Sequence, residues 1–361
     1  MTDYFFISSP LHFLIAANIS IQSVRNESVL VIMARDGGIA DRFRLAAEQH
    51  PDIFNRIIVL PIEANQGRRT RSPRFRAIKE LFSDAGQARL FTGNDRRLDF
   101  QYAMHVATES GARPQGIYMD EGAVTYMGHK SMNRIAHRYI DPLFKRLFIG
   151  RWYQPAITTG ASAWVDTLYA AFPEHVHPLL KKKPLVAIAS EPFATPQFKA
   201  LARDMLPDGE ASAEALRGIK VVVTLPHEAS YIHAPATYEA ISGHLLAHFE
   251  PSQVAIKPHP RITDRDLLTR LFPGAILLEP TVGMEVLLAL LDEDCLVAGD
   301  ISSTLLTTKW LRPSLPVVAL MVHAAPPELM TDLYTALEIP MVAPEALPEW
   351  LSVLRPVTKH R

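Results

Sequence analysis

Short apolar runs alternate with longer amphipathic stretches along most of this chain. The first runs are YFFIS, VLVIMA and IIVLPI, and helix-like segments lie between them. A strand that is buried on both faces is a continuous apolar run, and parallel strands need a long crossover, which is usually a helix. The pattern therefore predicts α/β architecture with parallel sheets.

A second series of apolar runs follows a basic, proline-containing stretch at residues 181–190. It comprises IKVVVTLP, QVAIKPHP, AILLEP, CLVAGD and PVVALM. The chain has 361 residues, and single hydrophobic cores stop growing at about 250–300 residues. We therefore predict two Rossmann-like domains, at residues 1–180 and 181–340, with the boundary in the region 178–218. A cleft between two domains is the usual place for a ligand.

The composition is that of an ordinary globular protein, with 48% hydrophobic and 21% charged residues. The formal net charge of −1 gives no global attraction to nucleic acid. Cys295 is the only cysteine, which excludes an internal disulfide and a cysteine-based metal cage. Asp3 occupies the place of a basic signal-peptide start, and no apolar stretch reaches the length of a membrane span. We expect a cytoplasmic protein.

Two common nucleotide-binding motifs are absent from the sequence. Neither GxGxxG nor GxxxxGK[ST] occurs in the chain. These glycine-rich loops cradle the phosphates of dinucleotides and of nucleoside triphosphates. Their absence disfavours dehydrogenase and P-loop chemistry.

Two acidic residues, Asp120 and Glu121, follow the apolar run GIYM and precede Gly122. Open α/β sheets gather ligand-binding groups at the carboxyl ends of their strands. Closely spaced carboxylates repel one another, and this raises the pKa of one of them toward that of a general base. The competing interpretation is a simple turn, because Asp and Gly are turn residues.

A histidine between two prolines follows the apolar run VAI, in the segment Lys257-Pro258-His259-Pro260. The prolines stiffen the backbone at the end of a strand. A fixed imidazole is suited to general acid catalysis, since the acid must be held in place. A histidine in a proline-rich loop without a catalytic role is the alternative.

A pair of serines, Ser302 and Ser303, lies between the strand-like run CLVA and the helix-like run LLTTKWL. Backbone amides at a helix N-terminus, together with two hydroxyl groups, make a phosphate-binding site. A serine at this position is also a common helix N-cap. Both interpretations can hold together.

Glu285 lies in the apolar segment VGMEVLLALL. A carboxylate is costly to bury without a partner, and the two hydroxyl groups of a ribose are one such partner. The alternative is a solvated acid in the first turn of a helix, which the helix dipole favours.

In their order along the chain, these four motifs resemble those of the bacterial sialyltransferases. That group includes multifunctional sialyltransferases, lipooligosaccharide sialyltransferases and polysialyltransferases. The resemblance implies a GT-B fold, with two Rossmann-like domains whose parallel sheets face each other across a cleft. It also implies inverting transfer of sialic acid or a related nonulosonic acid from a CMP-activated donor, without a metal or another cofactor. The acceptor would be a surface glycan, a lipid or a protein.

The resemblance assigns a role to each motif. Asp120 would deprotonate the acceptor hydroxyl, and His259 would donate a proton or a hydrogen bond to the departing CMP phosphate. Glu285 would hold the ribose, and the serine pair would bind the phosphate. By the same resemblance, Lys257, Pro260, Glu121 and Gly122 are further candidates for the site. Thr224, His227 and Ser9 are candidates because they follow the first strand-like run of a domain. Ser9 has an alternative role as an N-cap.

Three expectations stay open at this point. The alternative functions are another GT-B enzyme, such as a Kdo transferase or a UDP-sugar enzyme, and a catalytically silent protein that binds a nucleotide sugar. Analogy with two-domain sugar-nucleotide transferases predicts that residues 341–361 form a helix that packs back on the first domain. Two basic clusters are either solvated or in peripheral contact with the inner membrane, at roughly 1 kcal/mol per residue: Arg68, Arg69, Arg71, Arg74, Arg76 and Lys79, and Lys181 to Lys183.

Overall fold

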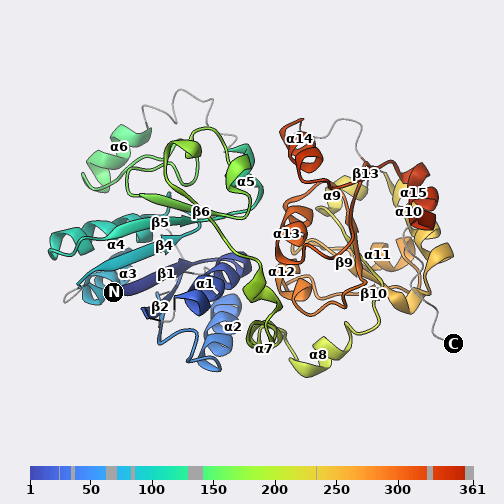
Figure 1. The fold of residues 1–361 in the computed structure, drawn as a ribbon, viewed down its shortest axis with the longest axis horizontal. Coiled ribbons are helices and arrows are strands. Elements are labelled where there is room, and N and C mark those ends of the chain that lie inside the picture. The colour runs from blue at the N-terminus through green and yellow to red at the C-terminus, as the bar shows by residue number, and fades with distance from the viewer. Residues whose placement is uncertain are drawn as a thin grey trace. The chain divides into compact units, whose positions relative to one another are not determined.

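The chain forms two compact units in the computed structural model, Met1–Met205 and Leu206–Arg361. Each unit contains one parallel β-sheet with helices around it (Figure 1). Among the residues that the structure describes, no helix has the length and apolar character needed to cross a membrane. The described residues are 1–23, 25–33, 37–61, 71–82, 86–128, 141–232, 234–322 and 328–353.

The first unit is a doubly wound domain around a seven-stranded sheet in the order β3-β2-β1-β4-β5-β6-β7. Chain direction across the sheet reverses between β1 and β4, so right-handed crossovers place helices on both faces. Accordingly, α3 packs against α4, whereas α2 packs against α7. The strands are β1 (Thr2–Ile7), β2 (Glu27–Ile32), β3 (Arg56–Val59), β4 (Ala88–Thr92), β5 (Gln115–Met119), β6 (Thr167–Ala170) and β7 (Leu185–Ala187), and the helices are α1 (Pro10–Gln22), α2 (Gly37–Glu48), α3 (Arg71–Leu81), α4 (Leu98–Glu109), α5 (Ala123–Met127), α6 (Asp141–Phe148) and α7 (Pro196–Asp204).

The second unit repeats this plan with six parallel strands in the order β10-β9-β8-β11-β12-β13. The order in which successive strands are added to this sheet reverses between β8 and β11. The strands are β8 (Val221–Thr224), β9 (Val254–Lys257), β10 (Ile276–Leu277), β11 (Leu296–Gly299), β12 (Val317–Leu320) and β13 (Met341–Val342), and the helices are α8 (Glu210–Glu214), α9 (Glu228–Tyr231), α10 (Pro235–His248), α11 (Arg265–Leu271), α12 (Met284–Leu288), α13 (Ser303–Leu311), α14 (Glu328–Ala336) and α15 (Leu347–Val353). The two sheets confirm the predicted parallel α/β architecture.

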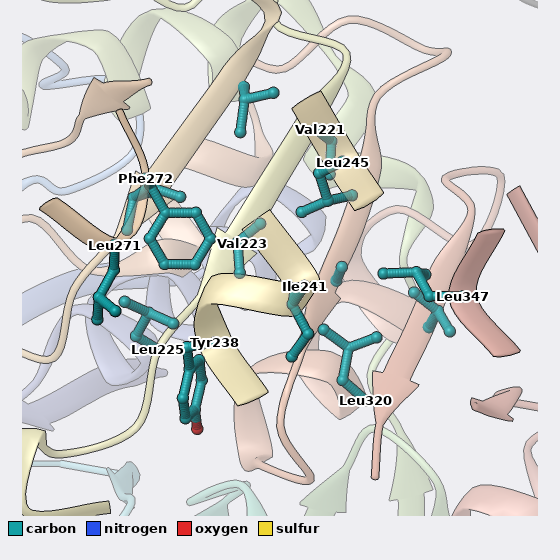
Figure 2. Packing of buried hydrophobic residues seen from close by; sticks show 14 of the residues in the cluster. Val221, Val223, Leu225, Tyr238, Ile241, Leu245, Leu271, Phe272, Leu320 and Leu347 are labelled. Atoms are coloured by element: carbon teal, nitrogen blue, oxygen red, sulfur yellow. The ribbon is translucent and has the colours of Figure 1, made fainter. Parts of the chain in front are cut away.

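The core of the second unit follows from the two side-chain periodicities. Val221 and Val223 lie on one face of β8 because alternate residues of a strand point the same way. Ile241 and Leu245 lie one turn apart on α10 and pack against that face (Figure 2). This packing fixes the strand ends on which the candidate site is built.

The closing helix belongs to the second unit. Leu347 and Leu351 of α15 are buried in the same core as β8 and α10. Residues 347–353 are therefore part of the second unit's core, and packing of the closing segment on the first domain stays a prediction. Residues 354–361 lie outside the described part of the chain.

The predicted domain limit at residue 180 is too early. Strand β7 pairs with β6 in the first sheet, and the division falls between Met205 and Leu206, within the predicted boundary region 178–218. The basic stretch before β7 suggested a linker, but Lys183 donates from Nζ to the carbonyl oxygens of Ser162 and Val165, each at 2.6 Å. These bonds tie the stretch into the first domain.

Candidate active site

Three predicted strand ends meet at one edge of the second sheet. In the strand register, Thr224 at the end of β8 lies beside Lys257 of β9 on one side and Gly299 of β11 on the other. A Cβ atom on Gly299 would lie 2.0 Å from Oγ1 of Thr224, so only glycine allows this close approach. The structure thus brings these ends together at the point where the chain direction reverses, which is the usual ligand position in open α/β sheets.

His259 and His227 are neighbours at this edge, with ring centroids 5.3 Å apart. Nδ1 of His259 accepts a hydrogen bond from the backbone N–H of Arg261 at 3.1 Å. In the same way, Nδ1 of His227 accepts from the N–H of Ala229 at 3.3 Å. In the neutral form of each ring, the proton therefore resides on Nε2. Both imidazoles are fixed by the backbone of their own loops.

The charge state of His259 sharpens its predicted role. Burial lowers the pKa of His259, and neighbouring positive groups lower it further. An unperturbed histidine has a pKa of about 6.5, so this ring is neutral at pH 7. It offers an N–H hydrogen bond to a phosphate oxygen rather than a ready imidazolium proton.

Lys257 is 5% exposed and joins two loops of the second domain. Its Nζ donates to the carbonyl oxygens of Pro258 at 2.9 Å and Pro280 at 3.1 Å. Burial lowers its pKa to about 8, against the opposing effect of Glu285 and Glu279. The ammonium group therefore holds the His-Pro turn in place and has one hydrogen beyond these two bonds. Pro260, after His259 in this turn, is exposed.

Glu285 lies in the first turn of the short helix α12, and Gly283 is the N-cap residue. Met284 and Val286 beside it are buried, whereas Glu285 is partly exposed. The charge of its carboxylate raises the pKa of Lys257, against the larger effect of burial. Its apolar neighbours anchor the helix and leave the carboxylate at the surface, in the electrostatic neighbourhood of the His-Pro turn.

Ser302 occupies the N-cap position of α13, but its hydroxyl group does not cap the helix. Within the described residues, its buried Oγ has no hydrogen-bond partner. Tyr334 of α14 fixes the backbone instead, since its hydroxyl accepts from the N–H of Ser302 at 2.9 Å and donates to its carbonyl oxygen at 2.6 Å. Ser303, the first residue of α13, is exposed. A held backbone and an unused hydroxyl at a helix N-terminus suit an anionic ligand.

In the first domain, Asp120 is 2% exposed and forms the centre of a structural clamp. Oδ1 accepts from the N–H of Gly122 at 2.7 Å and from the hydroxyl of Thr125 at 3.0 Å. Oδ2 accepts from the N–H of Ala171 at 2.9 Å and from the hydroxyl of Tyr126. Burial raises the pKa of Asp120, and these hydrogen bonds oppose that rise. Four donors fill the usual acceptor positions of a carboxylate, which weighs against Asp120 as the base.

Gly122 has a local role at this clamp. It is the N-cap of α5 and has φ of 69°, a backbone conformation that favours glycine. Its N–H is one of the donors to Asp120. The local geometry of Asp120 and Gly122 is that of the competing turn interpretation.

Glu121 has a different environment from its neighbour. Its side chain is 29% exposed, and Oε2 lies 3.3 Å from Nε2 of the buried His12. Ser9 is the N-cap of α1 and accepts a hydrogen bond from the N–H of His12 at 3.3 Å, as its alternative interpretation predicts. Gly93 follows β4 and lies directly against the His12 ring. Sequence reasoning missed Gly93, because no local motif marks it.

The basic clusters are only partly available at the surface. Arg74 is buried and pairs with Asp99 at 2.9 Å, and Lys183 is tied to two carbonyl oxygens. Arg68 and Arg69 lie outside the described residues, and so does the side chain of Arg71. The exposed members of the clusters are Arg76, Lys79, Lys181 and Lys182.

Carboxylates at Asp-x-Asp spacing occur twice in the second domain. Asp264 caps α11 by accepting from the N–H of Leu267 at 2.9 Å, and Asp292 accepts from the N–H of Gly218 at 3.1 Å. In the described ranges, no group of three histidine, cysteine or acidic residues could hold a metal ion. We assign Asp264 and Asp292 to structural contacts.

The two domains together have the GT-B fold, as the resemblance predicted, and solved structures share it along nearly the whole chain. One is the α/β-galactoside α-2,3-sialyltransferase of Photobacterium phosphoreum, with 11% identity, TM-score 0.58, and coverage of 96% of this chain and 98% of that one. Another is the UDP-GlcNAc 2-epimerase of Neisseria meningitidis, with 12% identity, TM-score 0.56, and coverage of 98% and 91%. A UGT transferase of Siraitia grosvenorii has 10% identity, TM-score 0.50, and coverage of 97% and 89%.

These similarities show the fold, and they do not show which reaction the protein catalyses. Neither a protein-family model nor a curated protein matches the sequence. The structures that share the fold include two transferases and an epimerase. One fold therefore carries different reactions, and the choice between them depends on the chemistry of specific side chains.

Proposed function

We propose that this protein is an inverting glycosyltransferase that moves sialic acid or a related nonulosonic acid from a CMP-activated donor. The acceptor is a hydroxyl group of a glycan, a lipid or a protein, and neither a metal nor another cofactor takes part. The observation that carries the proposal is the donor set of the second domain, namely the fixed Nε2–H of His259 and the unused hydroxyl of Ser302.

The leaving group determines what the donor site must do. When the bond between the anomeric carbon and the phosphate oxygen breaks, negative charge develops on that oxygen. Preorganised hydrogen-bond donors stabilise such charge without rearrangement. His259 and Ser302, with the exposed amides at the start of α13, provide donors of this kind. The remaining ammonium hydrogen of Lys257 adds a further one.

The nucleoside is held by the rest of the edge in this proposal. The Glu285 carboxylate accepts hydrogen bonds from the ribose hydroxyls, and Thr224 and His227 line the end of β8 beside it. The first domain provides the base, a carboxylate of the Asp120–Glu121 pair. Direct attack by the acceptor oxygen, opposite to the departing phosphate, gives inversion at the anomeric carbon.

Calorimetry with CMP, CDP and UDP tests the donor class. We expect CMP to bind most tightly to the wild-type protein. His259→Ala is expected to keep its folded structure and to release CMP from CMP-N-acetylneuraminic acid about 10²–10³-fold more slowly, as when one preorganised donor is lost elsewhere. His248→Ala, an exposed histidine of the same domain, is the matched control.

Three outcomes contradict this proposal in different ways. A clear preference for UDP would transfer the protein to the UDP-sugar enzymes. Tight CMP binding without turnover of any CMP-sugar would make it a silent binding protein. A fully active His259→Ala variant would remove the role of that residue.

We also propose a cytoplasmic location with contact to the anionic surface of the inner membrane. Arg76, Lys79, Lys181 and Lys182 are the exposed cations that support this proposal. Each cation near such a surface contributes about 1 kcal/mol. Co-sedimentation with phosphatidylglycerol vesicles measures the contact, and an equal yield with neutral vesicles would contradict it.

A further inference from the structure

His12 is a buried histidine whose ring has no hydrogen-bond partner among the described residues. It is 1% exposed, and both Nδ1 and Nε2 lack a partner. Oε2 of Glu121 lies 3.3 Å from Nε2, within ion-pair range, and this oxygen also has no hydrogen-bond partner within the described part of the chain. Buried polar groups are normally satisfied, so such a pair calls for an explanation in function.

The fold keeps space for this ring. A Cβ atom on Gly93 would lie 1.8 Å from Nε2 of His12 and 2.3 Å from Cδ2. Any side chain at position 93 would therefore displace the imidazole from Glu121. The glycine is required here for the close approach of the ring and not for an unusual backbone angle.

The pair lies where the first sheet is expected to bind a ligand. His12 is in the first turn of α1 after β1, Gly93 follows β4, and Glu121 follows β5. These strands are neighbours in the order β1-β4-β5, and the chain direction reverses between β1 and β4. Ligands of open α/β sheets bind at such a reversal, beyond the carboxyl ends of the strands.

The adjacent carboxylates differ in what a substrate can reach. Asp120 is buried and accepts four hydrogen bonds from the protein. Glu121 is partly exposed, and its backbone is fixed by a hydrogen bond from its N–H to Oγ1 of Thr125 at 2.9 Å. A base needs a lone pair within hydrogen-bond reach of the proton that it removes. Glu121 meets this requirement and Asp120 does not.

We propose that Glu121 is the base that activates the acceptor hydroxyl, and that His12 is the positioning residue behind it. This inference rests on the proposed transferase function. The acceptor proton passes to the Glu121 carboxylate while the acceptor oxygen bonds to the anomeric carbon. The bond from that carbon to the phosphate oxygen breaks, and its electron pair leaves with CMP. His12 keeps the carboxylate in place through the contact of Nε2 with Oε2, and the protonated carboxyl group then loses its proton to water.

Carboxyl labelling tests the accessibility argument without any substrate. The full chain is treated with a water-soluble carbodiimide and glycine ethyl ester, and the peptides are analysed by mass spectrometry. We expect labelling of Glu121 and protection of Asp120. Equal labelling of the two residues, or labelling of Asp120 alone, would overturn the assignment.

Turnover tests the catalytic role, with CMP-N-acetylneuraminic acid as donor and p-nitrophenyl lactoside or water as acceptor. Glu121→Gln is expected to lower kcat by about 10²–10³-fold, the usual contribution of a general base, with CMP affinity unchanged. Formate is expected to restore activity to Glu121→Ala. Glu109→Gln, an exposed acid of the same domain, is the matched control.

His12→Asn and His12→Gln separate positioning from folding. Each is expected to lower kcat by about tenfold, which is less than the roughly 10²–10⁴-fold effect of a group that itself transfers the proton. Each is also expected to change the pH profile, which a purely structural role would leave in place. Glu121→Gln with wild-type turnover would refute this inference. A wild-type chain that neither binds CMP nor turns over the donor would refute the transferase proposal instead, and the labelling result would still decide between the carboxylates.

Discussion

Two sites were predicted from short motifs at strand ends: the acidic edge of the first domain, around Asp120 and Glu121, and the proposed CMP-binding edge of the second domain, around His259 and Ser302. Their side chains have different hydrogen-bond partners. Asp120 directs both of its carboxylate oxygens to donors of its own domain. Ser302, in contrast, leaves its hydroxyl without a partner among the described residues. A motif residue can therefore be part of the scaffold or face a ligand, and its hydrogen-bond partners distinguish the two.

The largest expected effect is on the scaffold side of this comparison. Asp120→Ala removes the acceptor for the N–H groups of Gly122 and Ala171 and for the Tyr126 hydroxyl. Each unsatisfied buried donor costs about 1–3 kcal/mol, so the variant is expected to lose about 3 kcal/mol or more of unfolding free energy. Urea unfolding of the full chain measures the loss, with Glu109→Ala as the control.

The affinity for CMP is expected to survive this change in whatever fraction of the chain stays folded, because the residues that we propose to bind CMP belong to the second domain. The comparison would break if Asp120→Ala proved as stable as the wild type while transfer stopped. That result would return the role of base to Asp120 and remove it from Glu121.

A smaller and opposite effect is expected at Ser302. Its hydroxyl has no partner to lose, so Ser302→Ala should leave the unfolding free energy nearly unchanged. The affinity for CMP should fall by about tenfold, which corresponds to about 1.4 kcal/mol for one hydrogen bond to a charged group. Calorimetry and thermal unfolding are measured on the same sample.

Thr304→Ala is a poor control for Ser302, because a second hydroxyl at the start of α13 could contact the same ligand. Ser314→Ala is better, since Ser314 contacts Glu293 at 3.3 Å in an exposed loop. A Ser302→Ala variant that lost stability and kept its affinity would mean that the hydroxyl is structural. The contrast with Asp120 would then disappear.

The sequence predicted the fold and the strand ends well, because apolar runs and motif positions are local properties. VAIK ends as a strand at Lys257, and GIYM ends before Asp120. The domain limit was misplaced because Lys183 is basic in composition, yet its ammonium group binds carbonyl oxygens of its own domain. Local composition does not show where a long side chain ends.

The partners of the acidic edge could not be predicted for a similar reason. His12, Gly93 and Glu121 are far apart in sequence, and only the strand order β1-β4-β5 brings them together. The Asp120–Glu121 dipeptide likewise gives no indication that Tyr126 and Ala171 fill one carboxylate. Neighbours in sequence can have different roles because successive residues at a strand end point in different directions.

The smallest expected effect concerns Lys257, whose ammonium group has both a structural role and a proposed contact with CMP. Its pKa in the folded protein is about 8, below the value of about 10.4 for an unfolded chain. Between these values the unfolded chain binds more protons, so the unfolding free energy should rise with pH over this window, and Lys257→Met should lack that rise. The affinity for CMP should fall over the same window, because the ammonium group loses its proton. The fall should be less than about tenfold, because only one ammonium hydrogen is left for the ligand. Urea unfolding and calorimetry across the window measure both trends, with the exposed Lys182→Met as the control. If the unfolding free energy of the wild type fell with pH relative to that of Lys257→Met, the lowered pKa of the buried Lys257 would be contradicted. If the affinity for CMP did not change over the window, Lys257 would have a structural role only.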